Sequence, residues 1–111
     1  MHRGNLISGS IKLGDEVLAE IDLERRMAIS RAHTATHMVH KAFREALGET
    51  ATQAGSENSP GRFRFDFPAT GAVPASVLND VESRVNTLLL DNLEVSAEVM
   101  SQDAAKKLGA M

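Results

Sequence analysis

Three histidines stand close together in the segment HTATHMVH, at positions 33, 37 and 40. At about 100° per residue, an α-helix places His37 about 40° around the axis from His33, and His40 about 20° on the other side. All three side chains would therefore share one face of a helix. Two imidazoles four residues apart can close on one zinc ion, because their side chains lie above one another. The spacing permits a metal site.

The spacing alone leaves a second interpretation open, since histidines also occur as half-buried polar residues on amphipathic helices. The metalloprotease motif needs a glutamate directly after its first histidine as general base, and this chain has Thr34 there. The chain has no cysteine, so further ligands within it would have to be His, Asp or Glu, and none stands out as a third. Any zinc site built on these histidines is incomplete in this sequence.

The histidines belong to a predicted helix that ends at Leu47, with Gly48 as its C-terminal stop. The helix begins either at an N-cap formed by Asp22 or further along, near Ser30. Apolar residues recur along it at intervals of three and four and form one face that must pack on another element. These residues are Ala32, Ala35, Val39, Phe43 and Ala46. The histidines flank this face, so we expect them at the edge of a cleft.

Strict alternation in RFRFDF, residues 62–67, predicts a half-buried strand whose three phenylalanines face the core. The opposite face carries Arg62, Arg64 and Asp66. Two interpretations stay open for these arginines: they could contact the phosphates of a nucleic acid, or they could form ion pairs on an exposed face.

The other elements come from the same kind of pattern. Residues 5–8 and 17–22 predict a β-hairpin, a second helix begins near Pro74, residues 93–100 predict a strand, and Ser101 caps a short helix. The second helix has a buried stripe formed by Val77, Val81, Val85 and Leu88 or Leu89. The predicted fold is therefore α+β, with a mainly antiparallel sheet packed with two longer helices and one short helix, preceded by a short hairpin.

Composition excludes several classes of protein. A chain of 111 residues is one domain or a piece of one, and 42% apolar with 24% charged residues is typical of a globular protein. No stretch approaches the roughly 18–20 apolar residues of a membrane span, and no secretion signal is present, so we expect no membrane partner and a cytoplasmic location. A net charge of -3 gives no basic stripe that predicts nucleic-acid binding by charge alone.

Several motifs, in this order, resemble the editing region of the alanyl-tRNA synthetases and the related free-standing alanyl-tRNA editing proteins. They are HTATHMVHKAFREALG, TQAGSENSPGRFRFDF, VESRVN and AAKKLGAM. The residues before them resemble the end of the small β-barrel that precedes this region in the family. The resemblance divides the chain into residues 1–22, the end of the barrel segment, and residues 23–111, the N-terminal part of the editing domain.

The resemblance implies a fold shared with the editing domain of threonyl-tRNA synthetase, and an activity that hydrolyses serine or glycine wrongly attached to the tRNA for alanine. Binding differences of about 1–3 kcal/mol cannot separate such similar amino acids well enough, so a second, hydrolytic step is needed. By resemblance, His33 and His37 are two of four zinc ligands, Thr36 recognises the hydroxyl of serine, and Gln53 contacts the substrate end. No protein nucleophile is implied.

In the family, the other two zinc ligands come from a Cys-x-x-x-His motif beyond the equivalent of Met111. We therefore expect a synthetase fragment that binds zinc weakly and is inactive alone. The parent would ligate alanine to tRNA with ATP and Mg at residues outside this chain, and its partners would be the tRNA for alanine and the rest of the synthetase. The alternatives are a non-catalytic tRNA-binding or structural module and a truncated free-standing editing hydrolase.

Overall fold

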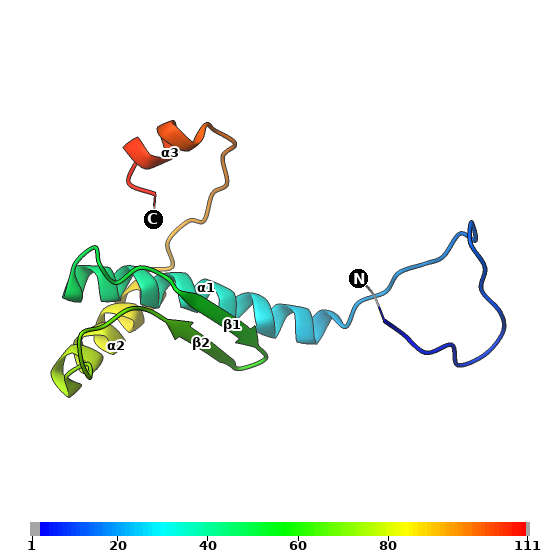
Figure 1. The fold of residues 1–111 in the computed structure, drawn as a ribbon, viewed down its shortest axis with the longest axis horizontal. Helices are drawn as coiled ribbons and strands as arrows, with labels where there is room; N and C mark the ends of the chain where they lie inside the picture. Colours follow the sequence, from blue (N-terminus) through cyan, green and yellow to red (C-terminus); the bar gives the residue numbers. More distant parts are fainter. Residues whose placement is uncertain (1–2, 111) are drawn as a thin grey trace.

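The structure is a computed structural model that describes residues 3–110, and these form three helices and one β-hairpin. In chain order the elements are α1 (Leu23–Leu47), β1 (Gly55–Ser59), β2 (Arg62–Asp66), α2 (Ala75–Leu90) and α3 (Gln102–Lys107). Figure 1 shows the hairpin lying along α1 and α2 packed near the C-terminal part of α1. The predicted α+β class, with an antiparallel sheet, two longer helices and one short helix, is confirmed.

Local chemistry sets both ends of α1. The Asp22 side chain accepts a hydrogen bond of 2.9 Å from the backbone N–H of Arg25, so the helix begins at the earlier of the two predicted positions. At the other end Gly48 has a φ of 90°, and its N–H donates to the carbonyl of Arg44. Residues with a side chain rarely adopt this φ, which is why glycine ends the helix as predicted.

The hairpin is an antiparallel ladder in which Ser59 pairs with Arg62 and Gly55 pairs with Asp66. Pro60 and Gly61 close the turn, and Gly61 has a φ of 71°, as in a type II turn. The strand predicted in RFRFDF is confirmed. Its partner β1 has the sequence GSENS, which lacks apolar residues and which the sequence predicts only as a polar loop.

The core lies between α1, the hairpin and α2. The Phe43 ring centroid on α1 lies 4.8 Å from that of Phe67 and 6.4 Å from that of Phe65, so these phenylalanines face the core as predicted. At the surface, Arg84 Nε of α2 lies 3.1 Å from Glu45 Oε2 of α1. The buried cluster consists of Ala42, Phe43, Ala51, Val81 and Val85. Val81 and Val85 confirm the stripe predicted on α2.

Three predicted β segments are not strands in the described part of the chain. Residues 5–8 and 17–22 do not pair as a hairpin, and residues 93–100 have no neighbouring strand. Their apolar side chains are exposed, with Ile7 at 97% and Val99 at 106%. A strand needs a partner for its hydrogen bonds and cover for its apolar face, and an isolated hairpin is marginal in water. The prediction of a hairpin from short apolar runs, and of a strand at residues 93–100 from alternation, was therefore wrong for the described residues.

The short helix α3 begins as predicted, since the Ser101 side chain accepts a hydrogen bond from the N–H of Ala104. It packs on none of the other described helices or strands (Figure 1). The radius of gyration is 19.3 Å, against about 13 Å for a compact chain of similar length. The described residues do not include residues 1, 2 and 111, which lie at the ends of the predicted segments 1–22 and 23–111. The division of the chain into these two segments stays a prediction.

The core predicts a large effect from one truncation. Phe43→Ala removes the ring that packs against Phe65 of β2 and Phe67 directly after it, and we expect it to lower the free energy of unfolding by about 3 kcal/mol, measured by urea unfolding. Leu90→Ala is the matched control, because Leu90 is 87% exposed, and it should cost less than about 0.5 kcal/mol. Equal losses in the two variants would contradict this core.

Candidate functional site

Helix α1 carries four candidate groups on its middle turns, His33, Thr36, His37 and His40, and burial separates them. Thr36 and His40 are buried, whereas His33 and His37 are exposed. The hairpin and the loop before it cover the helix on the side of Thr36 and His40, and leave the outer histidines open. His40 is therefore a core residue in this structure, although its angle around the helix is close to that of His33.

His33 and His37 approach each other through the same ring nitrogen. Their Nε2 atoms lie 3.1 Å apart, and their ring centroids are 4.8 Å apart at a tilt of 47°. Two nitrogen ligands at about 2.0–2.1 Å from a tetrahedral zinc ion are about 3.3 Å from each other, so the pair fits two corners of such a site. Among residues 3–110, no three His, Asp or Glu side chains come together closely enough to hold a metal ion. The two histidines therefore fit two of the four ligand positions around a tetrahedral zinc ion.

Thr36 lies under the hairpin and is 2% exposed. Its Oγ1 is 2.9 Å from the carbonyl oxygen of Ala32 and 2.7 Å from Oδ1 of Asn58 on β1. A hydroxyl has one proton and donates to one oxygen at a time. If the side-chain amide of Asn58 were rotated by 180°, its NH2 group would instead donate to the Thr36 hydroxyl. Thr36 thus links α1 to β1, and protein oxygens already take the one proton that its hydroxyl can donate.

Asn58 is the partner that sequence reasoning missed. Its strand lacks the alternation that identifies a strand, so residue type gives no reason to select it. The one available signal is the pair Pro60 and Gly61 directly before the strand RFRFDF, because such a pair marks a turn and implies a strand on its other side.

Gln53 lies in the loop between α1 and β1, exposed to solvent, and its Nε2 donates a 3.1 Å hydrogen bond to Ser56 Oγ. The loop is held on both sides of this residue. Before it, Ala51 is 2% exposed and belongs to the core cluster. After it, the N–H of Ala54 donates to the carbonyl of Asp66 at 2.8 Å and extends the ladder. Only two residues therefore separate the anchors that place Gln53.

His40 fills the space between α1 and the start of this loop. Its ring centroid lies 5.0 Å from that of Phe65, and its Nε2 is buried without a hydrogen-bond partner among the described residues. Burial lowers the pKa of His40, a hydrogen bond with the backbone of Ala51 opposes this, and the positive charge of Arg44 and the neighbouring His37 lower it further. The ring is therefore neutral at pH 7.

The energetic balance at His40 is unfavourable for the fold. A buried nitrogen without a partner costs about 1–3 kcal/mol, whereas one hydrogen bond contributes a net stabilisation of about 0.5–1.5 kcal/mol. An apolar side chain of similar volume would fill the same space without this cost.

On the outer face of the hairpin, the ion-pair interpretation is confirmed for one arginine. Arg64 lies 3.0 Å from Glu57 on the neighbouring strand and 3.0 Å from Asp66 on its own strand. All three side chains are exposed, so these pairs contribute little to stability.

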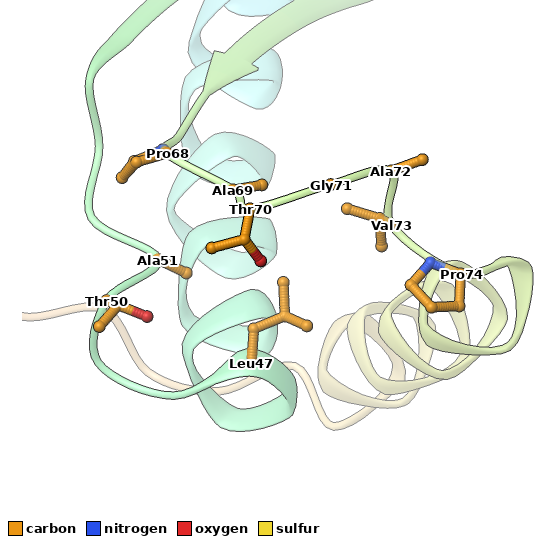
Figure 2. A pocket seen from close by; sticks show the side chains of 10 residues that line it. All are labelled: Leu47, Thr50, Ala51, Pro68, Ala69, Thr70, Gly71, Ala72, Val73 and Pro74. Carbon is orange, nitrogen blue, oxygen red and sulfur yellow. The ribbon is translucent and has the colours of Figure 1, made fainter.

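One hollow of about 530 Å³ lies at the C-terminal end of α1, under the loop of residues 68–74. Figure 2 shows Leu47, Ala51, Thr70 and Val73 pointing toward its interior. None of its lining residues is titratable, so it offers no acid or base for catalysis.

A second hollow of about 620 Å³ runs between α1, α2 and residues 92–95. His37 lines it together with apolar side chains that include Met38 and Leu88. His37, one of the two exposed histidines, therefore borders an apolar groove on the side of α1 that the hairpin does not cover.

Curated relatives match the chain along its whole length. It is 68% identical to an alanine–tRNA ligase of Nocardioides sp. (strain ATCC BAA-499 / JS614), 64% identical to that of Acidothermus cellulolyticus, and 54% identical to that of Streptomyces avermitilis. In each case the match covers 100% of this chain and 12% of the relative. The chain thus spans about an eighth of the length of these relatives.

No protein-family model matches the chain. No solved structure matches it either. In the described part of the chain, none of the helices combines the length and the apolar character needed to span a membrane.

The burial of neutral His40 predicts a pH dependence of stability. Burial lowers the pKa of His40 below 6.5 in the folded state, so on acidification the unfolded chain takes up a proton first. The unfolded state then binds more protons, and the contribution of His40 to stability is lost as the pH falls from 6.5 through the folded pKa.

We expect urea unfolding between about pH 7.5 and pH 5 to show a steeper loss of stability in the wild-type chain than in His40→Leu. The leucine side chain fills the space and does not titrate. Identical slopes in the two chains would mean that His40 is not buried as a neutral ring.

Proposed function

The chain belongs by sequence to the alanyl-tRNA synthetase family, of which it matches one segment, and we propose that this segment supplies half of a zinc-dependent editing site. The site would hydrolyse the ester that joins a wrong amino acid, serine or glycine, to the tRNA for alanine. The observation that carries the proposal is the 3.1 Å separation of the Nε2 atoms of His33 and His37, which suits two ligands of one tetrahedral ion.

Three further features support this proposal. Both histidines are exposed, so ligands from elsewhere in a longer protein can reach the ion. The relatives are about eight times as long as this chain, which leaves ample sequence for the missing ligands. The pair sits on the middle turns of a long helix, where packing of the hairpin below fixes its position.

When bound, zinc would supply Lewis-acid chemistry, which orients the aminoacyl group and its attacking water. His33 and His37 would hold the ion through neutral rings, since a protonated imidazole has no free lone pair. Thr36 would read the hydroxyl of serine, with the substrate taking a hydrogen bond that Asn58 makes in this structure. Gln53 would contact the substrate end. The ester is already activated by its linkage to the ribose, so no protein nucleophile is required.

The longer protein that carries this segment is, by this proposal, an alanine–tRNA ligase that binds tRNA and uses ATP and Mg at residues outside the chain. The relatives are named as alanine–tRNA ligases, and the proposal assigns the same activity to the longer protein that carries this chain. The editing segment would act on the same tRNA after ligation.

The zinc role predicts the effect of removing either histidine from the longer protein. His33→Ala and His37→Ala should each lower Ser-tRNA hydrolysis by more than about 100-fold. Removing a residue that only hydrogen-bonds to a metal ligand lowers activity about 10–100-fold, and removing the ligand itself should cost more. Zinc content should fall in parallel, while ligation of alanine should be unchanged. Thr34→Ala is the matched control, because Thr34 is an exposed neighbour on the same helix. Hydrolysis that survives both histidine variants would favour a non-catalytic tRNA-binding module.

The incomplete donor set predicts weak metal binding by the 111-residue chain alone. Two histidines should bind zinc no more tightly than the micromolar range, and the chain should not hydrolyse Ser-tRNA. Titration with zinc, followed by calorimetry, measures this directly. A submicromolar site with one ion per chain would show that His40 or an acidic residue completes the shell.

A further inference from the structure

We propose that Asn58 is a specificity-determining residue of the editing site, because its side-chain amide competes with the hydroxyl of a serine substrate for the hydroxyl of Thr36. This inference rests on the proposed function, in which Thr36 reads the serine hydroxyl. It adds that the chain itself supplies a competitor, so that Asn58 sets how strongly serine is favoured over glycine as a substrate.

Two protein oxygens lie within hydrogen-bond distance of the Thr36 hydroxyl. The carbonyl oxygen of Ala32 is 2.9 Å from Oγ1, and Oδ1 of Asn58 is 2.7 Å from it. One proton serves only one of these oxygens at a time. With the amide of Asn58 turned over, Thr36 donates to Ala32 and accepts from the NH2 group of Asn58. Each short contact then contains a proton, which makes this the favourable orientation.

In this orientation the amide of Asn58 binds Thr36 as a serine hydroxyl would. Both groups can donate one hydrogen bond to Oγ1. They exclude each other, because Thr36 is only 2% exposed while Asn58 is bonded to it. A substrate hydroxyl therefore reaches Oγ1 only after the amide of Asn58 has moved away.

Asn58 can move its side chain without disrupting the core. It is half-buried and is not part of the buried cluster between α1, the hairpin and α2. Its backbone is held by strand pairing, in which Asn58 lies opposite Phe63 of β2. A change of side-chain rotamer leaves this pairing in place and is sufficient to free Thr36.

Competition of this kind affects serine and leaves glycine untouched. Glycine has no side chain, so its ester leaves the bond between Thr36 and Asn58 intact. Serine has to break that bond before its own hydroxyl can replace it. One hydrogen bond is exchanged for another of similar strength, so serine gains less from Thr36 than it would from an unoccupied hydroxyl.

The test measures kcat/KM of the longer protein for hydrolysis of Ser-tRNA and of Gly-tRNA. Asn58→Ala removes the competitor, so the ratio of the serine value to the glycine value should rise about three- to tenfold, the factor expected for one hydrogen bond. Asn58→Asp places a carboxylate beside Thr36, and a charged acceptor holds the hydroxyl more strongly, so the ratio should fall about tenfold. The value for Gly-tRNA should stay within about twofold of wild type in both variants.

Ser59→Ala is the matched control on the same strand. The Ser59 hydroxyl donates to the carbonyl of Arg62 across the turn and makes no bond to Thr36 in this structure. The serine-to-glycine ratio should therefore be that of the wild type. A ratio that rises in Ser59→Ala as much as in Asn58→Ala would mean that any loosening of β1 causes the effect, and would overturn the inference.

Removal of the Thr36 hydroxyl tests the route of the effect. Thr36→Val keeps the branched shape of the side chain, so in a chain that already carries it Asn58→Ala should leave the serine-to-glycine ratio unchanged. A ratio that still rises there contradicts the inference. So do equal changes for both substrates in Asn58→Ala, since these would mean that Asn58 only holds β1 on α1. If Asn58→Ala does not fold, Asn58→Asp decides, and an unchanged ratio overturns the inference.

The proposed function fails separately from this inference. Hydrolysis of both esters that survives His33→Ala removes the zinc-centred site, and the inference with it. Loss of hydrolysis in His33→Ala, together with an unchanged serine-to-glycine ratio in Asn58→Ala, keeps the editing site and overturns only the role of Asn58.

Discussion

The packing of the described core depends on the covered face of α1, because the hairpin and α2 both rest on this helix. Buried residues of α1 begin only at Ala32, the tenth of its 25 residues, and continue to Phe43. The N-terminal turns are open, with Leu23 at 70% and Met27 at 58% exposure. A helix of 25 residues is about 37 Å long, and a five-residue hairpin cannot cover that length.

Because the hairpin covers only one side of α1, it also determines which candidate site residues are buried and which are exposed. Thr36 and His40 lie on the covered side and interact with protein groups, whereas His33 and His37 are exposed and His37 borders an apolar groove. A single helix thus holds the two histidines proposed to bind metal and the groups that contact the hairpin within two turns of each other. Their relative positions follow from helix geometry and do not depend on loop conformation.

Sequence reasoning succeeded where the determining interactions are local. The caps at Asp22 and Ser101 and the stop at Gly48 each involve residues within four positions, so the sequence contains the whole cause. Strand pairing is not local. The polar strand β1 forms because β2 turns back onto it, while the alternating residues 93–100 find no partner among the described elements. For the same reason, helical spacing identified His33 and His37, but only the folded chain brings Asn58 to Thr36.

The core elements follow one another without interruption between residues 23 and 90, and each packs on an element near it in the chain. Contacts of short sequence separation form quickly, and folding during synthesis proceeds from the N-terminal side. The core can therefore form as soon as residue 90 has left the ribosome. The histidine pair would then stand on a finished helix before any later ligand is made, so metal capture would be the last event in the assembly of the site.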